Sequence, residues 1–146
     1  MIWPVTVAGF FYKREYNLFM GLFKVKVRIA NPEDITKGKS FELLVDSGAH
    51  YSVLSIQDLK DLGIHPVMEE RFDVADGRTI RRKVGGGFFE IDGKRGYAPV
   101  IFGLKGDIPV LGATALEALC LQVDPIRRRL VPLTLKVLPS VYPPRK

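Results

Sequence analysis

The chain has 146 residues, which is enough for one domain with a substantial core but too few for two domains. Hydrophobic residues make up 47% and charged residues 26%, as in soluble globular proteins, and no apolar run is long enough to span a membrane. The net charge of +6 would suit an acidic partner, but no aromatic-interleaved RNA motif and no zinc-ligand spacing accompanies it, so nucleic-acid binding is an alternative of low weight.

Regular patterning begins near residue 20, and residues 1–19 are predicted to be an N-terminal extension. Apolar and basic residues alternate over 22–29, which predicts a half-buried strand. A loop over 31–38 leads to a second strand at 40–46, in which the continuous apolar run Leu43-Leu44-Val45 predicts burial on both faces. Ser55-Ile56-Gln57-Asp58 is a capping box that opens a short helix, and Gly63 ends it.

The second half of the chain is predicted to consist mainly of short strands and turns. Strands at 69–75 and 78–91 flank a two-residue hairpin turn, Asp76-Gly77, and the glycines at 85–87 predict a bend or a bulge in the second of these strands. Asp92-Gly93 is a second hairpin turn. Three more strands (94–102, 121–124 and 130–138) surround a helical segment at 115–119, and the prolines after 138 mark a tail, 139–146. This pattern predicts an all-β domain over 20–138, a small closed barrel or sandwich with one or two short helices.

Asp46-Ser47-Gly48-Ala49 stands directly after the buried run of the second strand. A lone buried carboxylate is costly unless another group shares or stabilises its charge, and Gly48 lacks a Cβ where a backbone must come close. A polar turn after the strand would also explain these residues. The motif nevertheless resembles the active-site loop of aspartic proteases, in which two apolar residues precede Asp, then Thr or Ser, then Gly.

The resemblance extends over about 23–133 and is to the retroviral-type aspartic proteases, in particular their small cellular and archaeal-type members. Four features follow in that family's order: the Asp46 loop, the helix at 55–63, a glycine-tipped hairpin at Asp76-Gly77 that is similar to the family's flap, and the segment 109–112, which is similar to the stretch packed beneath the catalytic loop. The resemblance implies that the chain is one half of a homodimeric enzyme, with neither a metal nor any other cofactor.

The resemblance also implies a role for each matching residue. Asp46 would be the catalytic carboxylate, facing the Asp46 of a second copy, and Gly112 would support the loop from below. Ser47 would hydrogen-bond to the opposing loop, Gly48 would permit close approach, and Ala49 offers no hydroxyl to the carboxylates, so we expect a pH optimum milder than that of pepsin. An extended peptide or unfolded protein would be the substrate, and the residues expected to bind it are His50, Tyr51, Ala75, Asp76, Gly77, Arg78, Val110 and Leu111.

The sequence departs from the viral pattern at two positions. Viral members form an ion pair where this chain has His50 and Ala113, so the loop must be held in another way, and because both partners are absent no buried charge is left unpaired. The strand that would pair two copies is either 130–138 or 1–12. A catalytically silent dimer that binds peptides is the principal alternative to a protease, whereas a Ser47–His50 nucleophile pair lacks an orienting acid. The single Cys120 and the absence of an early positive charge predict an intracellular, cytoplasmic protein.

Overall fold

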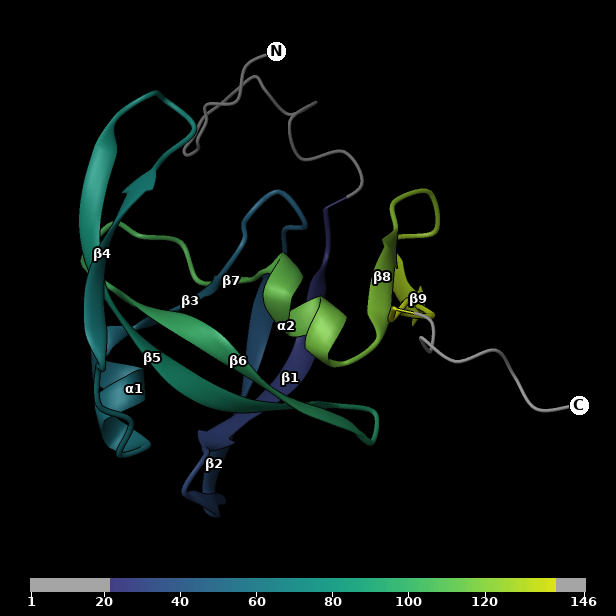
Figure 1. Cartoon of the computed structure of the whole chain (residues 1–146), viewed down its shortest axis with the longest axis horizontal. Coiled ribbons are helices and arrows are strands. Elements are labelled where there is room, and N and C mark those ends of the chain that lie inside the picture. Colours follow the sequence, from purple (N-terminus) through teal and green to yellow (C-terminus); the bar gives the residue numbers. More distant parts are fainter. Residues whose placement is uncertain (1–21, 139–146) are drawn as a thin grey trace, which may run out of the picture.

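The computed structural model describes residues 22–138, so the predicted N-terminal extension and the Pro-rich tail lie outside the described residues. Strands dominate this part of the chain, together with two short helices (Figure 1). In chain order the elements are β1 (Lys24–Asn31), β2 (Asp34–Val45), β3 (Ser52–Ser55), α1 (Ile56–Asp61), β4 (Met68–Asp73), β5 (Thr79–Ile91), β6 (Lys94–Gly103), β7 (Val110–Leu111), α2 (Ala113–Ala118), β8 (Leu121–Asp124) and β9 (Arg129–Pro132). None of the helices described here is both long and apolar enough to cross a bilayer.

Seven of the strands form one sheet that closes on itself. Their order is β1-β2-β7-β3-β6-β5-β4, and an additional antiparallel pairing of β1 with β5, centred on Ile29 and Phe89, completes the ring. β4 pairs only with the first half of β5 and is the edge strand of this sheet, and β8 and β9 form a separate hairpin. The prediction of an all-β fold with one or two short helices is confirmed.

The alternation predicted for the first strand is present in β1. Val27 and Ile29 have no exposed surface, whereas Lys24 and Lys26 on the opposite face are exposed. The buried face of β1 belongs to a single apolar core inside the ring, to which every strand of the ring and both helices contribute, whereas the edge strand β4 does not. The largest fully buried side chains of this core are Phe89, Ile29, Leu43, Leu54, Leu59, Leu111 and Leu119.

Both predicted helices are present, and the capping box at Ser55 is confirmed. The Ser55 hydroxyl accepts a hydrogen bond from the Asp58 N–H (3.1 Å) and donates one to the Asp58 carboxylate (2.9 Å). Gly63 follows α1 with a φ of +74°, the left-handed conformation that ends a helix at little cost for glycine. The second helix begins at Ala113, two residues earlier than predicted.

Two strand boundaries and one additional strand differ clearly from the prediction. β2 begins at Asp34 rather than at 40, because Gly38, opposite Ala30, leaves room for the Arg28 side chain, whose guanidinium donates to the Ile35 carbonyl. β3 is an additional strand. β9 ends at Pro132 instead of continuing to 138, since proline has no N–H for the ladder and the Leu133 N–H donates to the Cys120 carbonyl.

The two predicted hairpin turns and the glycine run have different outcomes. Asp92 and Gly93 both have positive φ (49° and 84°) and join β5 to β6 as predicted. The turn at Asp76-Gly77 is instead part of a longer loop, 74–78, in which the Val74 N–H donates to the Arg78 carbonyl and the Gly77 N–H donates to the Val74 carbonyl, both at 2.9 Å. The predicted bulge at 85–87 is wrong: the register with β6 is continuous, and a Cβ on Gly85 would lie 2.8 Å from the His65 carbonyl oxygen.

Candidate active site

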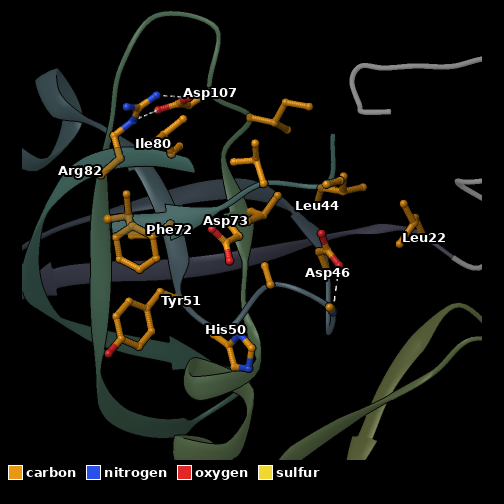
Figure 2. A pocket seen from close by; sticks show the side chains of 17 residues that line it. Leu22, Leu44, Asp46, His50, Tyr51, Phe72, Asp73, Ile80, Arg82 and Asp107 are labelled. Atoms are coloured by element: carbon orange, nitrogen blue, oxygen red, sulfur yellow. Dashed lines mark hydrogen bonds and ion pairs between the residues drawn. The ribbon is translucent and has the colours of Figure 1, made fainter. Parts of the chain in front are cut away.

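A cleft of about 560 Å³ lies between the Asp46 loop (46–51), the β4–β5 hairpin and the segment 107–110 (Figure 2). The loop and the tip of the hairpin extend from the same end of the closed sheet (Figure 1). The wall is mostly apolar and carries a few polar groups. The lining residues are Leu22, Leu44, Asp46, Gly48, Ala49, His50, Tyr51, Phe72, Asp73, Val74, Ala75, Ile80, Arg82, Ile101, Asp107, Ile108 and Val110.

Asp46 is positioned by the two strands beneath it. β2 ends at Val45, and the next N–H, that of Asp46, donates to the Leu111 carbonyl of β7 at 3.0 Å. The Asp46 carboxylate accepts a hydrogen bond from the Gly48 N–H at 2.9 Å, which fixes its orientation. Leu44 is half-buried and lines the cleft, so the expected burial of this strand on both faces is wrong at that residue. The half-buried Asp46 therefore presents its carboxylate at the cleft.

Gly112 packs directly beneath the loop. A Cβ at this position would lie 2.6 Å from the carbonyl carbon of Tyr51 and 2.7 Å from its oxygen, so only glycine fits without a shift of the backbone. The Gly112 N–H donates to the hydroxyl of Ser52 at 2.9 Å, and Ser52 is the one polar side chain buried among residues 22–138. This hydrogen bond joins the end of the loop to the start of α2.

The start of α2 holds the other side of the loop. The Ala113 N–H donates to the Ala49 carbonyl at 2.7 Å, and the Thr114 N–H and hydroxyl both donate to the His50 carbonyl, at 2.9 and 2.7 Å. These are the positions, 50 and 113, where the sequence lacks the ion pair of the viral pattern. Hydrogen bonds to the loop's main chain hold it here, whatever the side chains at these two positions.

Two contacts connect the walls of the cleft. The rings of Tyr51 and Phe72 meet edge to face at 5.9 Å, between the loop and β4. Between β5 and the segment 107–110, Arg82 donates two hydrogen bonds to the Asp107 carboxylate, at 2.7 and 2.9 Å, and the Leu104 N–H donates a third at 2.7 Å. Burial acts to raise the pKa of Asp107, but the hydrogen bonds and the charge of Arg82 outweigh it, so this pKa lies below its ordinary value.

A family model described as aspartyl protease matches residues 25–114, well over half of the chain and the whole of the Asp46 loop. The chain belongs to the retropepsin-like aspartyl protease family. The resemblance drawn from the sequence is thereby confirmed. Among solved structures, the solution structure of Simian Foamy Virus (mac) protease matches at 19% sequence identity and a TM-score of 0.47, over 65% of this chain and 92% of that chain. A comparison with curated proteins found no match.

The structure gathers about half of the site residues expected of an aspartyl protease around the cleft. Asp76 and Arg78 pair with each other at 2.7 Å in the solvent-exposed hairpin loop, and Leu111 and Gly112 are buried beneath the cleft. The expected residues that line the cleft are Asp46, Gly48, Ala49, His50, Tyr51, Ala75 and Val110, whereas Ser47, Asp76, Gly77, Arg78, Leu111 and Gly112 do not line it.

Several functional residues were missed by sequence reasoning. Phe72 and Ile80 are directly opposite each other on β4 and β5. Both alternate with exposed neighbours, and this pattern indicates that they lie on the same face of the hairpin, once the pairing of the two strands is known. Arg82 and Asp107 are 25 residues apart, and no local pattern joins them. Ser52 and Thr114 also act across the fold, and their small polar side chains carry no signal in the sequence.

Proposed function

We propose that the protein is an aspartic endopeptidase whose active site forms when two copies pair about a twofold axis and bring their Asp46 carboxylates together. The chain contains a single Asp-Ser-Gly motif, and twofold symmetry places the same loop opposite itself. The observation that carries the proposal is the placement of Asp46: its carboxylate is oriented by the Gly48 N–H at the cleft, while Ser47 and Gly48 beside it are exposed and open to a second loop.

Two such carboxylates suffice for peptide hydrolysis. Carboxyl groups about 3 Å apart cannot both ionise and therefore share one proton. The ionised member takes a proton from a bound water, which attacks the peptide carbonyl, and the protonated member donates to the carbonyl oxygen. When the C–N bond of the tetrahedral intermediate breaks, the carboxyl that took the water's proton donates it to the leaving amine, and one hydroxyl of the intermediate gives its proton to the other carboxylate, which restores the singly protonated pair. Ser47 of each loop hydrogen-bonds to the opposing loop and holds the two carboxylates in register.

An extended peptide is the substrate that fits this cleft. β4 is the edge strand of the sheet, so one row of its N–H and C=O groups has no strand partner within the described part of the chain. An extended peptide satisfies such an edge by adding to it as a further strand, and the apolar cleft beside it accepts the side chains. The β4–β5 hairpin then acts as a flap over the substrate.

The decisive experiment is a mixing assay with wild type and Asp46→Asn. Wild type is expected to cleave unfolded proteins and apolar peptides and to be inhibited by a statine-type transition-state mimic, whereas Asp46→Asn is inactive. If two chains share one active site, an equal mixture of the two proteins keeps about one quarter of the activity of the same total amount of wild type after subunit exchange, but it keeps about one half if each chain acts alone.

Controls separate the outcomes. Asp61→Asn removes a carboxylate from the exposed face of α1, where Gln57 is its one hydrogen-bond donor in the described part of the chain, and should leave the activity unchanged. The solution mass should be that of two chains at assay concentration. Equal rates for wild type and Asp46→Asn would leave a silent, peptide-binding dimer as the function, and a protein that stays monomeric at every concentration would refute the shared site.

A further inference from the structure

Besides Asp46 and Asp107, the cleft is lined by a third carboxylate, that of Asp73, which the described chain does not neutralise. Asp73 is the last residue of β4 and lines the cleft, and Figure 2 shows its carboxylate in the open space between the hairpin and the Asp46 loop. One of its oxygens accepts a hydrogen bond from the Thr79 hydroxyl at 2.9 Å, across the hairpin. No ion pair forms between it and any cation within residues 22–138.

The cleft wall also carries an ion pair, Arg82 and Asp107. Because these two charges cancel, a substrate meets the negative charge of Asp73 without a competing cation from this pair. Arg82 and Asp107 hold each other through two hydrogen bonds, with only 16% and 21% of their side chains exposed. A third nitrogen of Arg82 donates to the Arg81 carbonyl, and Asp107 also accepts from the Leu104 N–H. The two charges of this pair therefore cancel, and the pair adds no net charge to the wall.

We propose that Asp73 selects substrates that carry a lysine or arginine side chain within an otherwise apolar, extended segment. This inference rests on the proposed protease function and names its substrate class. The long aliphatic stem of Lys or Arg covers apolar wall, such as the neighbouring Phe72 and Val74, while the cationic head reaches the Asp73 carboxylate. There the head donates a charge-assisted hydrogen bond to a carboxylate whose one donor among residues 22–138 is the Thr79 hydroxyl.

Twofold symmetry predicts where in the substrate the basic residue should lie. In a dimer with one shared active site, Asp73 occurs twice, once on each flap, related by the axis that passes between the two Asp46 residues. A peptide lying across that axis meets the two carboxylates at equal distances on either side of the bond to be cut. The preference for a basic residue is therefore expected at two positions, equally far before and after the scissile bond.

The test uses a peptide series with an apolar extended sequence, in which each position in turn is lysine or norleucine, a side chain of similar length without the charge. For wild type we expect kcat/KM to be about two- to fivefold higher with lysine at one symmetric pair of positions, and this ratio to fall as salt is added. Asp73→Asn keeps an acceptor for Thr79 and should bring the ratio close to one. Asp73→Lys should bring the ratio below one, because the lysine of the peptide then meets a like charge.

The matched control is Glu70→Gln, which removes the same charge from the same strand outside the cleft and should keep the wild-type ratio. A lysine preference that survives in Asp73→Asn, or a wild type that shows no preference and no salt effect, would overturn the inference while leaving the protease function intact. The norleucine peptide reports on that function separately: if wild type does not cleave any peptide of the series, it is the proposed function that fails.

Discussion

Replacement of Ser52 by alanine tests how the Asp46 loop is held. The Ser52 hydroxyl accepts the hydrogen bond of the Gly112 N–H at 2.9 Å, and Ser52 is only 1% exposed. Alanine fills the same space but leaves this buried N–H without an acceptor. Such a loss costs about 1–3 kcal/mol of the free energy of unfolding, which in a domain of this size lowers Tm by about 3–15 °C.

The assay combines urea unfolding at fixed protein concentration with peptide cleavage. Ser55→Ala is the matched control, because it removes the N-cap of α1 and costs about 1 kcal/mol at a site remote from Asp46. We expect Ser52→Ala to lose at least about tenfold in kcat/KM, since a small displacement of the loop misplaces the carboxylate, and Ser55→Ala to lose little. If Ser52→Ala unfolds within about 0.5 kcal/mol of wild type, this hydrogen bond does not hold the loop.

Two further predictions concern stability. Gly112→Ala would put a Cβ 2.6 Å from the Tyr51 carbonyl carbon, so urea unfolding should show a loss of about 1–3 kcal/mol. Gly86→Ala is the control, because its Cβ would meet nothing within 4 Å, and it should change the stability by less than about 1 kcal/mol. Equal stability of the two variants would contradict the packing argument. Asp107 has a lowered pKa in the folded protein, so its ion pair stabilises the fold above the carboxyl's ordinary pKa of about 3.9, and this contribution is lost as the pH falls through the lowered value. Asp107→Asn should therefore be less stable than wild type by about 1–2 kcal/mol at pH 7, and the difference should vanish in strong acid; a difference that is constant from neutral pH to about pH 2 would show that the charge is not responsible.

The parts of the fold that the sequence predicted correctly depend on local physics. The alternation of β1, the capping box at Ser55 and the Asp92-Gly93 turn are each set by neighbouring residues, and all three are present. The Asp46 motif was identified for a related reason, because a carboxylate directly after a buried strand needs an explanation.

The errors occurred where distant residues decide the local structure. Gly38 suggested a loop, yet it lies inside β2 because Arg28 of the neighbouring strand occupies the space. Gly85 suggested a bulge, yet it keeps the strand regular next to the His65 carbonyl. The pair of Arg82 and Asp107 joins a strand to a loop 25 positions later, and such a contact cannot be deduced before the sheet order is known.

The Asp46 loop is anchored through its main chain, so the side chains at Ala49 and His50 can be changed without loss of these hydrogen bonds. Ala49 and His50 contribute carbonyl oxygens to the start of α2, while their side chains line the cleft. Mutational libraries at these two positions can therefore change what the cleft accepts without loosening Asp46. Conversely, the hydroxyl of Thr114, outside the cleft, is a point at which a change distant from the substrate would disturb the chemistry.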